Sequence, residues 1–200
     1  VTLGFNPDDG IMIGPSLKII NHGFRKTPYQ SFHQLKGLYS FSTSAVRLTY
    51  NNEFISVFGY KTDITTEIDY KGPNNTTNFF GYGMNSVYNK NGPKKFRDYR
   101  IRYDLADISL MLRHRFSPKV HLYLGPTFQF FHYDSTDKFN SARSVEVVPT
   151  PGIATSINDR QSYLGFRAML NIDTRNNTAV PTRGFVWNNS FRYLSGNNNK

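Results

Sequence analysis

The sequence predicts an all-β protein, namely an antiparallel up-and-down transmembrane β-barrel. Apolar and polar residues alternate with a period of two over long runs, and clusters of Asn, Gly and Pro separate these runs. Aromatic residues make up 16% of the 200 residues, although the mean hydropathy is only −0.51. This combination is expected where plentiful apolar residues are interleaved with polar ones.

The alternation predicts the strands in chain order. From Phe58 to Tyr70, Phe, Tyr, Thr and Ile occupy one face while Lys, Asp and Glu occupy the other, which is typical of a half-polar strand. The same pattern predicts strands at Ile11–Ile19, Leu35–Phe41, Val120–Tyr133, Tyr163–Asp173 and Phe185–Tyr193. Counting between turn signals gives about ten strands, joined as hairpins in a single domain over residues 1–200.

One segment changes its alternation. Ile101, Tyr103 and Leu105 occupy odd positions, whereas the apolar residues from Ile108 onward occupy even ones. Because one extra residue exchanges the two faces of a strand, we expect a β-bulge within Asp104–Asp107.

The turn signals set the expected topology. They stand at Asn6–Gly10, Lys71–Asn75, Asn89–Lys95 and Ser117–Lys119, and longer connections lie at Asn21–Gln30 and Asp134–Arg160. Assigning Ser117–Lys119 and Thr174–Gly184 to the periplasmic side puts Asp134–Arg160 outside, where the long loops of membrane barrels belong. Counting backward places Asn89–Lys95 outside and Lys71–Asn75 inside.

Strand length and aromatic placement favour a membrane barrel over a soluble sandwich. Sandwich strands usually span about 5 or 6 residues, whereas a tilted membrane strand needs roughly 9 to 11, which several runs here reach. Tyr and Phe near strand ends are typical of the aromatic girdles of barrels. The candidate lumen charges are Lys61, Asp63, Glu67, Asp69, Arg113, Arg115, Arg167 and Arg192. In a soluble all-β binding module, an alternative that stays open, this face would meet solvent.

Composition limits the chemistry and the partners. The chain lacks cysteine, which excludes disulfide scaffolds, thiolate zinc sites and cysteine nucleophiles. A net charge of +10 and a pI near 9.8 fit anionic lipid headgroups, lipopolysaccharide phosphates or nucleic acid as neighbours. We interpret the basic stretch Lys94–Tyr103 as a loop near charged headgroups, so no nucleic acid partner is expected. The sequence shows no signal peptide and no apolar run long enough for a spanning helix. Because it begins inside a strand-like pattern and stops in the Asn-rich SGNNNK, we expect it to be a fragment or a mature segment of a longer protein.

No metal and no cofactor is expected. His114, His121 and His132 are scattered over two strands, and the last two have opposite parity, so they would face different sides. Asp8 and Asp9 suggest a calcium loop, but the alternating ligands and the final Glu of an EF-hand are missing. A hairpin turn is therefore favoured at these residues.

Ser31, His33 and Asp63 suggest a lipase-like triad inside a barrel. No Gly-x-Ser-x-Gly elbow accompanies them. We therefore expect no enzymatic activity in this chain.

The stretch DTRNNTAVPTRGF, Asp173–Phe185, carries a family resemblance. It is similar to the Asp-x-Arg…Pro-Thr-x-Gly turn between barrel strands of the BamA/TamA outer-membrane assembly family, also called the bacterial surface antigen superfamily. The matching residues are Asp173, Arg175, Pro181 and Gly184. Their expected roles are structural: an ion pair between Asp173 and Arg175, a fixed φ at Pro181 and a turn conformation at Gly184 that other residues resist.

A second stretch, NFFGYGMN, resembles the Asn-Phe-x-Gly strand of the same family through Asn78, Phe79, Phe80 and Gly81. The tetrapeptide TRGF, Thr182–Phe185, is similar to the Val-Arg-Gly-Phe lid motif of the family. Because it directly follows a Val-Pro pair and opens a strand, we interpret it as part of the turn instead.

The resemblance implies a barrel of typically about sixteen strands in the outer membrane of a Gram-negative bacterium, with periplasmic modules and closing strands outside this chain. It implies a role in the insertion, assembly or translocation of envelope proteins through a polar lumen and lateral pairing with client strands. The implied partners are outer-membrane lipid, lipopolysaccharide, client barrel strands and other envelope proteins.

The stretches NPDDGIMIG and HGFRK resemble barrels fused to calcineurin-like phosphoesterases. They imply the alternative function, a membrane-anchoring barrel whose catalytic domain lies upstream of this chain.

Overall fold

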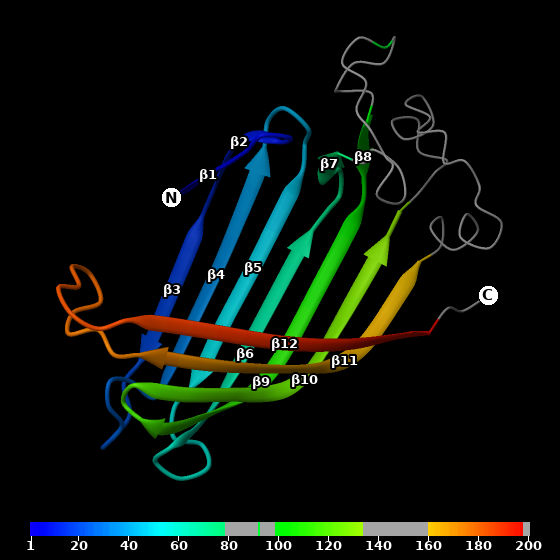
Figure 1. Cartoon of the computed structure of the whole chain (residues 1–200). Coiled ribbons are helices and arrows are strands. Elements are labelled where there is room, and N and C mark those ends of the chain that lie inside the picture. The colour runs from blue at the N-terminus through cyan, green and yellow to red at the C-terminus, as the bar shows by residue number, and fades with distance from the viewer. Residues whose placement is uncertain (79–91, 93–98, 134–159, 198–200) are drawn as a thin grey trace.

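The computed structural model describes residues 1–78, 92, 99–133 and 160–197. In these ranges the protein is all-β, with a ten-stranded antiparallel sheet and a separate two-stranded sheet (Figure 1). The expected all-β class is therefore confirmed. No helix in the described ranges is long and apolar enough to cross a membrane.

Most strands of the large sheet pair with the strand that follows them in the chain. They are β1 (Thr2–Asn6), β2 (Gly10–Gly14), β3 (Ser16–Asn21), β4 (Ser31–Ser40), β5 (Val46–Phe54), β6 (Thr62–Lys71), β9 (Asp104–Ser117), β10 (Val120–His132), β11 (Gln161–Asp173) and β12 (Val186–Asn197). The order across the sheet is β1-β2-β4-β5-β6-β9-β10-β11-β12, and β3 pairs with β4. The small sheet consists of β7 (Thr76–Asn78) and β8 (Arg100–Arg102).

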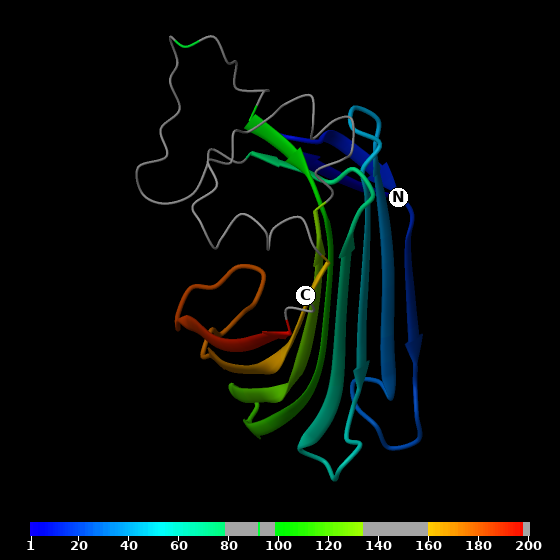
Figure 2. The ribbon, with the colours of Figure 1, turned by 90° about the vertical axis from the view of Figure 1, so that its right-hand side faces the viewer.

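The large sheet curls but does not close. Strands β3 to β6 form one wall, and β9 to β12 bend round toward it (Figures 1 and 2). In the described ranges β12 pairs only with β11, and β1 pairs only with β2. The antiparallel sheet is as predicted, whereas the closed barrel is not formed by these strands, because closure needs a hydrogen-bond ladder around the whole circumference.

The two faces of the sheet have opposite chemistry, and the apolar face is the exposed one. Exposed large apolar side chains on the outer face include Leu3, Phe5, Ile11, Ile13, Leu17, Ile19, Leu35, Tyr39, Leu48, Phe54, Ile108, Leu110, Leu112, Leu124, Phe128, Leu164, Phe166, Trp187 and Phe191. Buried residues in the described ranges are mainly polar, and the buried apolar ones among them are Met12, Ala45, Ile55 and Met111. This distribution is the reverse of a water-soluble core, which apolar residues fill.

The expected strand Ile11–Ile19 is divided in two. Pro15 separates β2 from β3 because it has no N–H group with which to continue the ladder. Its carbonyl accepts a hydrogen bond from the N–H of Gly37 at 3.0 Å.

The strand expected from Phe58 begins later, and one strand was not expected. Residues 55–61 form a turn, in which the Val57 N–H donates to the Thr62 carbonyl at 2.9 Å and Gly59 has a φ of 74°. β6 therefore starts at Thr62. β5 is additional to the predicted strands, although it follows the same alternation.

The β-bulge expected within Asp104–Asp107 is wrong. β9 pairs in regular register with β10 over these residues. The alternation changes because the chain leaves β8, which pairs with β7, and enters the large sheet after Tyr103. The register shift between β9 and β10 lies at the other end, between Val120 and His121.

The two longest connections, residues 72–103 and 133–160, lie at the same end of the sheet, which we call the long-loop end, and we call the opposite end the short-turn end. Residues 22–30, 55–61, 118–119 and 174–185 form the short-turn end, and residues 7–9, 41–45, 72–103 and 133–160 connect strands at the long-loop end. The predicted separation of Ser117–Lys119 and Thr174–Gly184 from Asp134–Arg160 is therefore confirmed.

The predicted side of Lys71–Asn75 is wrong. Lys71 pairs with Leu105 at the long-loop end, because β7 and β8 belong to one connection between the neighbouring strands β6 and β9. Apart from Gly92, Asn89–Lys95 falls outside the described residues.

Three glycines, Gly14, Gly125 and Gly165, stand where neighbouring strands approach too closely for a side chain, and the last two yield a first prediction. At Gly125 and at Gly165, an added Cβ atom would overlap a backbone carbonyl of the adjacent strand. We expect Gly125→Ala and Gly165→Ala each to lower the free energy of unfolding by about 1–3 kcal/mol, because the adjacent strand must move.

Gly37→Ala is the matched control, since the added Cβ would meet its nearest neighbour, a Leu48 methyl group, at an ordinary 3.4 Å. Urea titration followed by the fluorescence of Trp187, the single tryptophan, measures all three variants. If the three unfolded at the same midpoint, close strand approach would not explain the two glycines.

Candidate functional site

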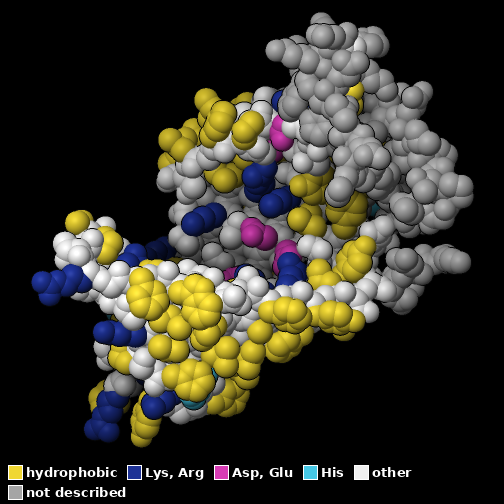
Figure 3. Space-filling view, viewed as in Figure 1, with side chains coloured by type: hydrophobic (Ala, Val, Ile, Leu, Met, Phe, Trp, Pro, Cys, Tyr) yellow, Lys and Arg dark blue, Asp and Glu magenta, His cyan; other side chains and the backbone are white. Residues whose placement is uncertain are grey.

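The inner face of the curled sheet carries the charged side chains, which Figure 3 shows in the hollow of the molecule. Cross-strand register places there all the candidate lumen charges except one: Asp63, Glu67, Asp69, Arg113, Arg115, Arg167 and Arg192. Lys61 lies exposed in the turn 55–61. The alternation of the sequence thus found most of this face correctly.

Asp63 joins two arginines near the short-turn end. Its side chain is fully buried, and its oxygens lie 2.8 Å from Arg113 Nε and 3.0 Å from a terminal nitrogen of Arg115. The backbone N–H of Ser56 donates a further hydrogen bond at 2.8 Å. These three donors compensate for the lost hydration of the carboxylate, and they hold the turn 55–61 against β9.

Glu53 extends this network to the segment before β4. It accepts a hydrogen bond from Arg113 at 3.1 Å and one from the Tyr29 hydroxyl at 2.8 Å. Burial, followed by the hydrogen bond to Glu53, raises the pKa of Tyr29 to about 12. Tyr29 therefore remains a neutral donor at physiological pH.

Two further ion pairs cross the concave side of the sheet. Arg167 on β11 lies 2.9 Å from Glu67 on β6, and Arg192 on β12 lies 2.7 Å from Asp107 on β9. In each pair two other strands stand between the partners in the sheet order. The partners meet because the curvature brings distant strands face to face.

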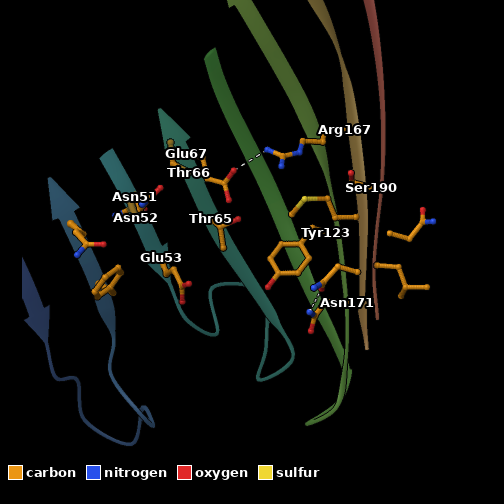
Figure 4. Close-up of a pocket in the computed structure, with 16 residues that line it drawn as sticks. Asn51, Asn52, Glu53, Thr65, Thr66, Glu67, Tyr123, Arg167, Asn171 and Ser190 are labelled. Atoms are coloured by element: carbon orange, nitrogen blue, oxygen red, sulfur yellow. Dashed lines mark hydrogen bonds and ion pairs between the residues drawn. The ribbon is translucent and has the colours of Figure 1, made fainter. Parts of the chain in front are cut away.

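A hollow of about 550 Å³ lies between these walls (Figure 4). Uncharged polar side chains form much of its lining, with two aromatic rings: Gln34, Asn51, Thr65, Asn171, Asn188 and Ser190, together with Phe32 and Tyr123. The charged residues of the lining are Glu53, Glu67 and Arg167. We call this site the amide-lined hollow.

Sequence reasoning missed most of this hollow and also Asp107. The amides stand on four different strands and share no motif, so their meeting depends on register and curvature. Asp107 was assigned to a bulge, although its alternation with the apolar residues from Ile108 onward indicates the inner face.

Asp9 forms a second buried cluster, at the long-loop end. Its side chain is fully buried and accepts hydrogen bonds from Arg47 and Asn6, both at 2.7 Å. Its other oxygen accepts from the Thr43 hydroxyl at 3.1 Å and from the Thr76 N–H at 3.3 Å. These bonds hold the predicted β1–β2 hairpin turn against the turn between β4 and β5.

The residues of the family strand motif are described only in part. Asn78 donates to Asp8 at 2.6 Å and so ties β7 to the β1–β2 turn. Phe79, Phe80 and Gly81 lie outside the described residues.

The residues of the imagined catalytic triad do not meet. Ser31 and His33 share the outer face of β4 with Leu35, whereas Asp63 lies on the inner face of β6. His33 Nδ1 instead lies 2.8 Å from the Asn52 amide nitrogen and 3.0 Å from the Tyr50 hydroxyl.

The histidines lie apart as well. His114 is bonded to Thr62 at 3.1 Å, His132 lies 3.5 Å from Asp104, and His121 is on the inner face. Within the described ranges, no group of three or more His, Cys, Asp or Glu side chains could hold a metal ion.

The turn between β11 and β12 has the expected ion pair. Arg175 donates to both carboxylate oxygens of Asp173, at 2.9 and 2.7 Å. Gly184 has a φ of 96°, and a Cβ atom there would overlap the Thr174 carbonyl. Pro181 is exposed in the turn, and Thr182–Phe185 precede β12, so TRGF belongs to the turn as predicted.

Comparison of the chain with protein-family models, with curated proteins and with solved structures finds no match. The resemblance to the BamA/TamA family stays a prediction that depends on the turn residues.

The Asp63 network yields a second prediction. We expect Asp63→Ala to lower the free energy of unfolding by about 3–5 kcal/mol, because Arg113 and Arg115 then lose their shared buried partner. Asp69→Ala is the control on the same strand and face, where an exposed side chain accepts, among the described residues, a single hydrogen bond from Thr49 at 2.8 Å. Urea titration compares the two variants, and equal losses would show that Asp63 does not hold β6 and the turn 55–61 to β9.

Proposed function

We propose that this chain forms part of the wall of a transmembrane β-barrel in the outer membrane of a Gram-negative bacterium. The observation that carries the proposal is the reversed chemistry of the sheet, whose outer face exposes apolar side chains while its inner face carries ion pairs and the buried carboxylate of Asp63. Such an outer face matches the hydrocarbon of a bilayer, and such an inner face matches a polar lumen.

Strand length and loop placement support the same proposal. β9, β10 and β11 have 14, 13 and 13 residues, which exceeds the roughly 9 to 11 that a tilted membrane strand needs. The longest connections gather at one end of the sheet, as the external loops of outer-membrane barrels do.

We further propose that the barrel acts in the insertion, assembly or translocation of envelope proteins, without enzymatic activity in this segment. The turn from Asp173 to Gly184, with its bidentate ion pair, supports this function through its resemblance to the BamA/TamA turn. The net charge of +10 suits contact with lipid headgroups and lipopolysaccharide, and client strands or other envelope proteins are the proposed further partners.

A third prediction separates the membrane barrel from a soluble binding module. Leu110 on the outer face is 49% exposed, so Leu110→Lys would be nearly neutral in water. If the side chain faces lipid near the bilayer midplane, the added lysine destabilises the folded barrel by about 2–4 kcal/mol. We therefore expect less folded protein in the outer membrane.

Thr49→Lys, which adds the same charge to the inner face of β5, is the control and should leave assembly unchanged. Membrane fractionation and heat-modified gel mobility measure folded protein for both variants. Recovery of the unaltered protein in buffer without detergent would contradict the membrane proposal.

A fourth prediction concerns the assembly function. Depletion of the full-length protein from its bacterium should lower the amounts of other folded outer-membrane barrels, because their insertion would slow. Quantitative mass spectrometry of outer membranes checks this. Unchanged barrel levels together with lost phosphoester hydrolysis at the envelope would favour the alternative, the anchor of a fused calcineurin-like phosphoesterase.

A further inference from the structure

We propose that the amide-lined hollow binds a neutral oligosaccharide. The ligand class goes beyond the proposed function and rests on it only in that the hollow would face the lumen of the barrel. Its volume of about 550 Å³ lies within the roughly 300–1,000 Å³ of typical ligand sites.

The charges that line the hollow already have partners. Glu67 is paired with Arg167 at 2.9 Å, and Glu53 is paired with Arg113 at 3.1 Å. An anionic ligand would have to compete with a carboxylate for each arginine, and a cationic ligand would have to compete with an arginine for each carboxylate. The hollow is therefore suited to a ligand without net charge.

Several uncharged polar side chains of the hollow are free to meet a ligand. Within the described ranges, Gln34, Asn51 and Ser190 form no side-chain hydrogen bonds. Gln34 and Asn51 stand directly opposite each other on β4 and β5, so their amide groups form a pair on one wall. An amide offers two donors and an acceptor, which suits the adjacent hydroxyl groups of a sugar ring.

The opposite wall continues this polar surface. Asn171 on β11 and Asn188 on β12 are cross-strand partners, and Asn171 donates to the Asn188 side-chain carbonyl, which leaves the other donors and acceptors of both amides available to a ligand. Ser190 lies two residues farther along β12 (Figure 4). Polar groups therefore face the ligand from both sides of the curled sheet.

Two aromatic rings add apolar surface to the hollow. Phe32 on β4 and Tyr123 on β10 belong to opposite walls, and each ring already has a cation over one face, Lys18 at 5.2 Å and Arg113 at 5.9 Å from the ring centroid. The faces of aromatic rings carry partial negative charge, so they attract the weakly positive C–H groups on the faces of a sugar ring. Rings together with amides match a ligand that has both C–H and hydroxyl surfaces.

An extended peptide fits the hollow less well. Of the strands that line the hollow, β4, β5, β6, β10 and β11 are each paired on both sides, and within the described ranges β12 alone has an open edge. The hollow lies against the face of these strands, whereas an added strand would have to pair along an edge. Recognition at this site must then depend on side chains, and the free ones are uncharged.

Isothermal titration of the whole 200-residue chain with maltohexaose and with mannohexaose tests the proposal. We expect saturable binding of at least one of them and weaker binding of trigalacturonate, which has a similar ring but carries carboxylates. The double variant Gln34→Ala/Asn51→Ala should weaken binding about tenfold or more, because two hydrogen-bonding groups are lost. Asn171→Ala, on the opposite wall, should weaken it as well.

Gln129→Ala is the matched control, because Gln129 is an inner-face amide outside the hollow, bonded to Asp107 at 3.2 Å. This variant should bind as the unaltered chain does, and unchanged urea midpoints show that the variants remain folded. The proposal is overturned if neither hexasaccharide binds, if trigalacturonate binds as tightly, or if the folded double variant binds normally.

The outcome is independent of the test for membrane integration. If the chain integrates into membranes but binds neither sugar, the result contradicts this inference alone. If the chain binds sugar but is recovered in buffer without detergent, the result contradicts only the proposed function.

Discussion

Arginine–carboxylate pairs across the concave face are the constraint on which the shape of this sheet depends. The carboxylates of Glu53, Asp63, Glu67 and Asp107 stand on β5, β6 and β9, whereas their arginine partners stand on β9, β11 and β12. The pairs Glu53–Arg113, Glu67–Arg167 and Asp107–Arg192 join strands that are not neighbours in the sheet, so they hold the later strands toward the earlier ones. A flatter sheet would separate Arg167 from Glu67 and Arg192 from Asp107, and it would leave charges on the inner face without partners.

The curvature that these pairs maintain explains the other features of the molecule. It brings the amides of β4 and β5 opposite those of β11 and β12, so that a hollow forms where a flat sheet would have none. It also makes the apolar face, which the alternation along each strand produces, the convex outer surface of the sheet, where large apolar side chains are exposed. The bend thus explains the inner hollow, whereas the alternation of the sequence explains the apolar outer surface.

Much of the fold could be predicted because alternation reports the face of each side chain directly. Asp63, Arg113 and Arg167 were found in this way, since a period of two needs no knowledge of neighbouring strands. The prediction failed where pairing changed between sheets: the step from β8 to β9 mimics a bulge, which also concealed Asp107. β5 was not among the expected runs because Asn52 interrupts its row of apolar residues. The hydrogen bond between Asn52 and His33 becomes visible only in the folded sheet.

The sequence by itself determined the all-β class, the two chemically distinct faces and the ion-paired turn at Asp173 and Arg175, because each follows from residues close together in the chain. Only the tertiary structure decided which carboxylate each arginine of the inner face meets, that Lys71 lies at the long-loop end, and that the described strands form an open sheet. These features depend on strand register and curvature, which join residues as far apart as Glu67 and Arg167, and no local pattern encodes such distances.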